Sequence, residues 1–390
     1  MAAEVLATAG VAVTVYEHMA SVGRKLLLAG RSGLNLTHAR PPGGLIAQYG
    51  SSGPRLAPAL EAFGPSQLRD WAHGLGETTF VGSTGRVFPV SKRATPLLRA
   101  WITRLRTLGV GFELRHRWAG WSSGGALIFT NAEGARLEAP ADAVVLALGG
   151  ASWPRVGSDG GWAEHVGARG VEVTRFSPAN SGVVIDWSSG FRSRFAGTPL
   201  KNVGIVVAGR SIRGDVMVTS TGLEGGAIYP HGPAIRDALD RDGSAALDID
   251  LQPDRTPAMV LDRLALRRPK DSFSNGMRHA FGLSQVAIAV MREAGAVPAD
   301  VKATRLPVVS LAPLDRAIST AGGIAWPEVD DGYMLRRLPG TFVAGEMIDW
   351  EAPTGGYLLQ ATFSTGVAAA KGLLQWLDQA EVSAARRAGS

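Results

Sequence analysis

Short apolar runs that end at glycines or at an acidic residue recur along the chain. Such runs are typical of buried strands in a parallel sheet. The first, residues 11–16, follows a stretch of helix-forming residues and ends at Glu17. Another, residues 143–148, is followed directly by Gly149 and Gly150. A helix that leads into a strand is the second half of a β-α-β unit, so the pattern predicts an α/β domain.

The pattern changes in the middle of the chain and returns near its end. Residues 177–230 show short alternating apolar and polar positions, typical of strands, and helical patterns follow up to residue 293. The pattern of the first part of the chain returns near the end, with a predicted strand at 340–346 and a long predicted helix at 356–381. We therefore expect one discontinuous domain, residues 1–176 and 311–390, interrupted by an inserted substrate-side domain at 177–310.

The composition is that of a folded protein without disulfides. Of the 390 residues, 45% are hydrophobic and 19% charged, which excludes a wholly disordered chain. No apolar run reaches the roughly 18 residues that cross a bilayer, and the start of the chain lacks the features of a signal peptide. We therefore expect a soluble, cytoplasmic protein. There is no cysteine, and the seven histidines show no metal-ligand spacing, so no metal site is predicted.

Charge and short motifs exclude several classes of function. The net charge of +6 comes from arginines and lysines scattered along the chain, and we predict neither a nucleic-acid nor a membrane partner. The oligomeric state is not predicted. The sequence contains no P-loop and no His-Glu-x-x-His, which argues against nucleotide hydrolysis and zinc proteolysis. Its 50 glycines cluster beside apolar runs, which indicates backbone that approaches a ligand closely.

Glu17 has the position of the ribose-binding acid in a dinucleotide-binding unit, at the end of a strand. In such units the acid follows the glycines of G-x-G-x-x-G by about 20 residues. Counting back from Glu17 reaches beyond Met1. One interpretation is that the first strand and the phosphate-binding loop are missing from this chain. The other is that Met1 is the true start and Glu17 is a solvated strand end.

Three segments resemble, in order, the sequence blocks of one family. Residues 17–38 read EHMASVGRKLLLAGRSGLNLTH, residues 147–160 read ALGGASWPRVGSDG, and residues 344–366 read AGEMIDWEAPTGGYLLQATFSTG. Together they resemble the HI0933-like flavoproteins, a group of FAD-binding oxidoreductases that includes bile-acid dehydro-steroid reductases. The chain has GRSGLN at 30–35 where members commonly carry GGGRCN, and it lacks their common Asn before Gln360. It is therefore similar to a cysteine-free subgroup, and its substrate stays open.

The resemblance implies a Rossmann-like FAD-binding domain, without its first strand and glycine loop, interrupted by an inserted β-rich and helical domain. It also implies a bacterial FAD-dependent oxidoreductase that transfers hydride or electrons between a reduced donor, NAD(P)H, and a small organic substrate. Two alternatives stay open. One is a flavoprotein scaffold without catalysis. The other is an RNA-acting flavoprotein, which only the positive net charge supports.

The resemblance also implies a set of cofactor-binding residues. The carboxylate of Glu346, at a strand end, can bind ribityl hydroxyls. The turn before the last helix would point free amides at the pyrimidine edge of the flavin. The full set is Glu17, Arg24, Lys25, Ser32, Gly33, Asn35, Thr37, Gly149, Gly150, Gly345, Glu346, Asp349, Thr354, Gly355, Gly356, Tyr357 and Gln360.

Three further residues are candidates outside that set. Arg86 and Lys92 lie in a segment, starting GRVFP at residue 85, that resembles another family block. Arg86 either orients an anionic substrate or is a surface turn residue. His231 is a candidate acid or base, with a structural role as the alternative. The sequence identifies no catalytic residue beyond these candidates.

Overall fold

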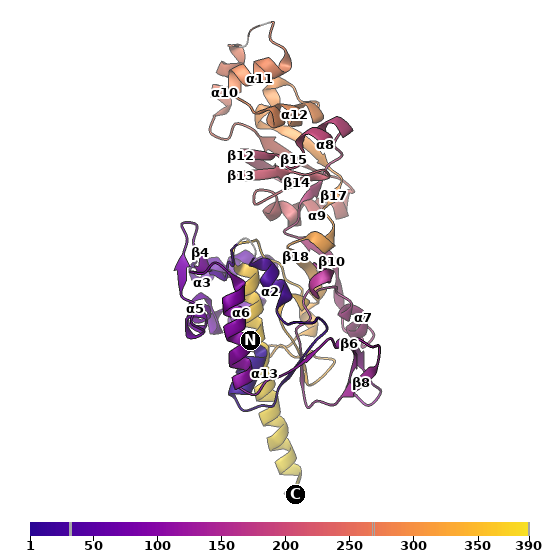
Figure 1. The fold of residues 1–390 in the computed structure, drawn as a ribbon. Helices are drawn as coiled ribbons and strands as arrows, with labels where there is room; N and C mark the ends of the chain where they lie inside the picture. The colour runs from indigo at the N-terminus through magenta and orange to yellow at the C-terminus, as the bar shows by residue number, and fades with distance from the viewer. Residues whose placement is uncertain (31–32, 267, 269, 389–390) are drawn as a thin grey trace. The chain divides into compact units, whose positions relative to one another are not determined.

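The computed structural model describes residues 1–30, 33–266, 268 and 270–388, with side chains up to residue 380. The chain forms two compact units (Figure 1). Unit 1 comprises Met1–Ser177 and Ser319–Ser390, and unit 2 comprises Pro178–Ile318. The sequence analysis drew these boundaries at 177 and 310. The role of the inserted part as a substrate-side domain stays a prediction.

Two pairs of parallel strands carry the α/β character of unit 1. Strand β1 (Thr14–Glu17) pairs with β5 (Gly111–Leu114), and β9 (Val144–Leu146) pairs with β19 (Thr341–Val343). Helix α1 (Ala2–Thr8) precedes β1, as the apolar pattern predicts. The predicted strands exist but are shorter than the apolar runs that indicated them. The α/β class is confirmed.

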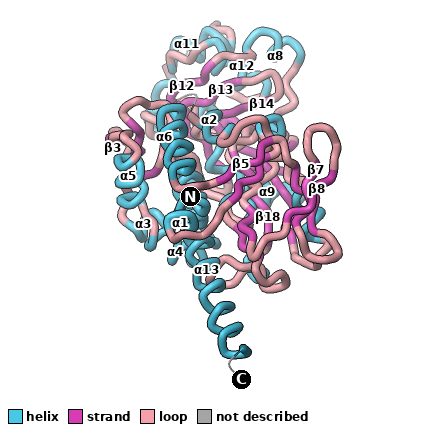
Figure 2. The backbone as a smooth tube through the Cα atoms, turned by 60° about the horizontal axis from the view of Figure 1, so that its bottom comes forward, coloured by secondary structure: helices cyan, strands magenta, loops and turns pink. Residues whose placement is uncertain are grey.

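Helix α13 (Tyr357–Ala388) is the longest element of unit 1. It packs against α1 and α4 (Gly53–Ala62), as Figure 2 shows. Small side chains on α13, such as the fully buried Ala361 and Ala369, let these helices approach closely. The other helices of unit 1 are α2 (Arg24–Ala29), α3 (Pro42–Ile46), α5 (Pro65–Gly74), α6 (Ala94–Thr107) and α7 (Trp162–Gly167).

Small antiparallel sheets complete unit 1. The aromatic ring of Tyr16 in β1 stacks on Phe129 of one of these sheets with ring centroids 3.9 Å apart, which packs the parallel and antiparallel layers together. The sheets are β2 (Thr37–His38) with β4 (Arg86–Pro89) and β3 (Thr79–Val81), and β6 (Arg117–Trp121) with β7 (Leu127–Thr130) and β8 (Arg136–Ala139). Strand β10 (Val173–Ala179) pairs with β18 (Ser319–Ile324).

Unit 2 is built on a seven-stranded antiparallel sheet in the order β16-β15-β12-β13-β14-β11-β17. Its strands are β11 (Val183–Val184), β12 (Pro199–Val207), β13 (Arg210–Val218), β14 (Gly222–Glu224), β15 (Ala245–Asp250), β16 (Thr304–Val308) and β17 (Ser310–Leu311). Its helices are α8 (Ser189–Phe195), α9 (Gly232–Asp242), α10 (Pro257–Ala265), α11 (Phe273–Phe281) and α12 (Gln285–Glu293). Ile205 of β12 lies opposite Ile249 of β15, and both are fully buried.

Strand β15 corrects the sequence analysis, which predicted only helices between 231 and 293. The strand forms because Leu247 and Ile249 are buried while their neighbours Asp248 and Asp250 are partly exposed, a period of two that fits a half-buried strand. Within the described part of the chain, no helix is long and apolar enough to cross a membrane.

Candidate functional site

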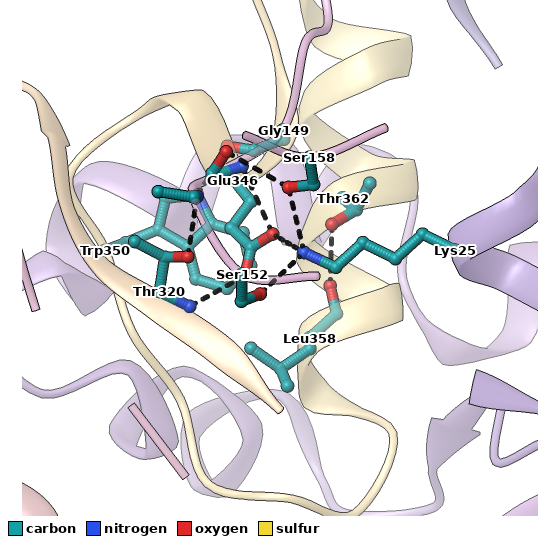
Figure 3. A network of polar contacts seen from close by, with 12 residues as sticks. Lys25, Gly149, Ser152, Ser158, Thr320, Glu346, Trp350, Leu358 and Thr362 are labelled. Carbon is teal, nitrogen blue, oxygen red and sulfur yellow. Dashed lines mark hydrogen bonds and ion pairs between the residues drawn. The ribbon is translucent and has the colours of Figure 1, made fainter. Parts of the chain in front are cut away.

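A network of polar contacts joins α2 to the end of β19 (Figure 3). The Nζ atom of Lys25 donates to Glu346 Oε2 at 2.6 Å, to Ser152 Oγ at 2.9 Å and to Ser158 Oγ at 3.2 Å. Glu346 lies in the short 3₁₀ helix η7 (Gly345–Met347), directly after β19. The Glu346 side chain is 13% exposed and that of Lys25 is 31% exposed, so salt screens this ion pair less than a surface pair.

Backbone amides hold the Glu346 carboxylate in place. The amide of Thr320 donates to Oε1 at 2.9 Å, and the amide of Gly150 to Oε2 at 3.3 Å. A Cβ atom at Gly150 would collide with the side chain of Thr320, so only glycine fits there. The Gly149–Gly150 turn that follows β9 therefore brings backbone directly against this carboxylate.

Glu17, at the end of β1, lies near the loop that carries Ser158. Its Oε1 accepts a hydrogen bond from the amide of Met19 at 2.9 Å. Gly157 has a φ of +107°, and a Cβ there would lie 3.8 Å from Glu17 Oε1. Gly157 precedes Ser158, which donates to the carbonyl of Gly150 at 3.0 Å, so Glu17 lies near the segment that takes part in the Glu346 network.

A second cluster forms where α13 begins. Gly355 and Gly356 have φ values of +131° and +94°, and a Cβ at Gly356 would collide with the backbone of Thr37. The Thr37 hydroxyl donates to Gln360 Oε1 at 2.6 Å. The structure thus brings together Thr37, Gly356 and Gln360, which the resemblance placed in one cofactor set.

Two buried acceptor atoms near this cluster have no hydrogen-bond partner within the described residues. They are Asn35 Oδ1 and His38 Nδ1, on either side of Thr37. Leaving a buried polar atom unpaired costs about 1–3 kcal/mol, so such atoms are typical of ligand sites.

The residues present fit the flavin nucleotide that the resemblance implies. Glu346 offers a carboxylate for ribityl hydroxyls, and Lys25 offers a cation for phosphate charge. The Gly149–Gly150 turn and the start of α13 offer close-lying backbone, whose first amides have no intrahelical acceptor. Asn35 Oδ1 offers an unpaired acceptor for a ring N–H.

Other predicted residues have local roles or no polar contact. Asp349 Oδ1 accepts from the amide of Gly322 at 3.2 Å, and the amide of Gly345 donates to Thr365 Oγ1 at 2.9 Å. The side chain of Arg24, the first residue of α2, makes no hydrogen bond or ion pair within the described part of the chain. Ser32 lies outside the described residues. The loop residues Gly33, with a φ of +111°, and Thr354 also belong to unit 1.

The remaining candidates divide between the two units. Lys92 lies with its Nζ 5.9 Å from the ring centroid of Phe80, on the surface of unit 1. His231 is 1% exposed, and its Nε2 lies 3.0 Å from the carbonyl oxygen of Ile205 in the core of unit 2. Burial lowers its pKa, and this setting favours its structural role.

Sequence reasoning missed four residues that the structure adds to the site. Ser152 and Ser158 lie in the block at 147–160 that carries the resemblance, so their hydroxyls were available as a signal. His38 is the last residue of the first block. The contact of Thr320 with Glu346 uses a backbone amide, which no side-chain pattern reveals.

Unit 2 has two surface hollows, of about 630 and 430 Å³. Asp237, Arg241 and Arg305 help to line the larger one, and Arg194 and Ile288 the smaller one. Every residue predicted to bind the cofactor belongs to unit 1 instead. None of the residues that line these hollows belongs to the predicted cofactor set.

Replacing Gln360 with leucine is expected to lower the free energy of unfolding by about 2–3 kcal/mol, because buried partners of its amide lose their hydrogen bonds. The amide donates to the carbonyl of Phe63 at 2.8 Å and accepts from Thr37. Urea denaturation followed by circular dichroism measures this change. Gln375→Leu, at an exposed position of the same helix, is the control and should stay within about 0.5 kcal/mol of the wild type. Equal unfolding midpoints for both variants would contradict the assignment.

A family model described as the HI0933-like protein Rossmann domain matches residues 1–372. The chain is also similar to a curated relative, the 3-dehydro-bile acid delta(4,6)-reductase of Clostridium scindens. The two are 23% identical over 383 residues, which cover 92% of each protein.

Solved structures of two steroid dehydrogenases are similar in fold. The 3-ketosteroid delta1-dehydrogenase of Sterolibacterium denitrificans has a TM-score of 0.53 and 13% identity, over 95% of this chain and 96% of that one. The 3-ketosteroid-delta4-(5alpha)-dehydrogenase of Rhodococcus jostii RHA1 has a TM-score of 0.50 and 15% identity, over 95% and 93%. At these identities the likeness shows the fold alone.

Proposed function

The chain belongs to the HI0933-like family, and from this premise we propose that it is an FAD-dependent oxidoreductase that acts on a small organic substrate. The observation that carries the proposal is the network in which the Gly150 amide and Lys25 contact Glu346, with Glu17 near the adjoining segment at Gly157. Two carboxylates, a cation beside one of them and closely approaching glycine backbone match the polar groups of an extended flavin nucleotide.

We assign a role to each of these groups and to the start of α13. Glu17 would bind the adenosine ribose, Glu346 the ribityl chain, and Lys25 would offset phosphate charge. The start of α13 would direct its free amides and its positive dipole end at the pyrimidine edge. FAD, when bound, supplies the hydride or electron transfer, and the protein supplies its orientation and the local electrostatic field.

For the electron donor we propose NAD(P)H. The sequence contains no G-x-G-x-x-G, so the nicotinamide would dock at the flavin without a Rossmann unit of its own. For the reaction we propose reduction of an activated C=C bond in a small molecule, as the name of the reductase from Clostridium scindens suggests. We also propose that the protein works in the cytoplasm, without nucleic acid or membrane.

Visible absorbance tests the proposal directly. Purified protein incubated with FAD and desalted should keep the flavin band near ~450 nm, and anaerobic NADH or NADPH should bleach it. A colourless protein after incubation with excess FAD would contradict cofactor binding. A yellow protein that neither nucleotide reduces would favour the scaffold alternative. Binding of RNA that persists at moderate salt would favour the RNA-acting alternative.

A further inference from the structure

Basic side chains from two segments of unit 1, residues 38–40 and Arg86, lie beside the Gly355–Gly356 turn. The imidazole of His38, at the end of β2, stacks on the ring of Tyr357 at the start of α13, with centroids 5.2 Å apart and planes at 12°. Arg40 Nε donates to the Tyr357 hydroxyl at 2.8 Å. Arg86 pairs with His38 in the β2–β4 ladder, and a Cβ on the first glycine of the turn would lie 3.8 Å from Arg86 Nε.

His38 presents a fixed and unpaired acceptor in this cluster. The residue is 9% exposed, and its Nε2 lies 3.0 Å from the carbonyl oxygen of Thr84. A carbonyl can only accept, so Nε2 carries the proton and Nδ1 is the bare nitrogen of a neutral ring. Nδ1 is buried and has no partner within the described residues. Gly85 leaves room for the ring, because a Cβ there would come within 2.5 Å of His38 Cε1.

The charges around His38 are all positive. Burial lowers the pKa of His38 first, and the guanidinium groups of Arg40 and Arg86 lower it further, against an opposing hydrogen bond to Thr84. Neither guanidinium has a carboxylate partner in the described part of the chain, and both side chains are exposed. Tyr357 is the facing titratable group from α13. The cluster therefore combines two uncompensated cations with an unpaired nitrogen.

We propose that His38, Arg40 and Arg86 form a substrate subsite for an anionic oxygen group, and that His38 takes up one proton from solvent when the anion binds. Guanidinium groups bind oxyanions through charge-assisted hydrogen bonds. An anion between them offsets the positive field that disfavours the imidazolium, and protonated Nδ1 then donates to the anion. This inference rests on the proposed function, because it assigns the substrate of that reaction to the turn where the flavin ring would lie.

The anionic oxygen can come from a substrate carboxylate or from a carbonyl oxygen that becomes enolate-like, and probe molecules separate these sources. FAD-loaded protein is titrated with benzoate, with pentafluorophenolate as a single oxyanion, and with uncharged benzamide. Flavin absorbance and calorimetry both report binding. Tight binding of benzoate favours a carboxylate, and tighter binding of the phenolate favours an enolate. Equal binding of benzamide would overturn the subsite.

Variants assign the binding to these residues. Arg40→Gln and Arg86→Gln should each raise the Kd of the preferred anion about tenfold, because each removes a hydrogen bond to a charged group. Arg106→Gln, at an exposed position in the last turn of α6, is the control and should leave the Kd unchanged. Since Arg40 and Arg86 are exposed, their loss should not unfold the protein. Unchanged affinity in both variants would overturn the proposal.

Proton uptake separates this role of His38 from a structural one. Calorimetry at pH 7 in two buffers of different ionisation enthalpy should show proton uptake on anion binding, which His38→Gln abolishes. His38→Asn replaces that variant if it does not fold. Anion binding without proton uptake in the wild type would overturn the role of His38. If Arg40→Gln or Arg86→Gln loses FAD instead of anion affinity, the guanidinium groups belong to the cofactor site and the subsite is wrong.

Failure of the proposed function is distinguishable from failure of this inference. A protein that never binds FAD contradicts the proposed function. Its calorimetric titration with benzoate still tests the subsite, because His38, Arg40 and Arg86 are positioned by contacts with protein groups of unit 1.

Discussion

Replacing Glu346 with glutamine is expected to raise the Kd for FAD about 10- to 100-fold, the largest effect of any single change of charge in unit 1. The carboxylate is the proposed partner of the ribityl hydroxyls, and a hydrogen bond to a charged group contributes about 1.5–3 kcal/mol. The change also leaves the ammonium of Lys25 without its ion-pair partner. Equilibrium dialysis with FAD, or flavin fluorescence quenching, measures the affinity.

The same substitution should lower the free energy of unfolding by about 2 kcal/mol. Breaking a fully buried pair costs about 3–5 kcal/mol, and the value is smaller here because the Lys25 side chain is 31% exposed. A double-mutant cycle with Lys25→Met isolates the coupling, because the double variant no longer contains an uncompensated charge. Glu61→Gln, exposed on α4, is the matched control. If Glu346→Gln binds FAD with wild-type affinity, the Glu346 carboxylate does not bind the cofactor.

Replacing Gly356 with alanine is expected to destabilise unit 1 by about 3 kcal/mol or more and to prevent FAD retention. A φ of +94° is strained for any residue with a side chain, and the new Cβ would meet the Thr37 backbone, which cannot rotate away as a side chain would. Thermal denaturation and flavin absorbance after desalting measure the two effects.

Two other glycines separate the causes of this effect. Gly10 has a φ of +86° with open space around it, so Gly10→Ala should show only the conformational cost, about 1 kcal/mol. Gly43 lies in α3 with open space and no positive φ, so Gly43→Ala should stabilise by about 0.5–1 kcal/mol. If Gly356→Ala lowers the free energy of unfolding no more than Gly10→Ala does, the close approach of α13 to Thr37 does not contribute to the stability of unit 1.

The parts of the fold that the sequence predicts are those with a strong local signal. Strand β1 ends at Glu17 and β9 lies ahead of Gly149, because buried parallel strands form continuous apolar runs bounded by polar residues or glycines. Strand β15 was missed because its alternation is short and its neighbours are helical. Strand β2, with two residues, has no periodicity to detect.

The candidate site was predicted as a set of residues and not as a set of contacts. The blocks placed Lys25 and Glu346 together as cofactor residues, but their ion pair joins positions 321 residues apart and depends on how α2 packs against η7. His38 is part of the first block, but the sequence analysis assigned it no role. Its unpaired Nδ1 depends on tertiary contacts, namely the bond of Nε2 to the Thr84 carbonyl and the packing of the ring against Gly85. The local pattern of apolar and polar residues does not reveal tertiary contacts of this kind.

The separation between Lys25 and Glu346 has a consequence for biosynthesis. A ribosome that adds about 5–20 residues per second needs roughly 15–60 s to extend the chain by the 321 residues between them. The whole of unit 2 is made in that interval, since it lies between the two segments of unit 1. The nascent chain can therefore fold its inserted unit before it can assemble the lysine–glutamate network, and a cofactor that depends on this network can bind only after Glu346 has been made.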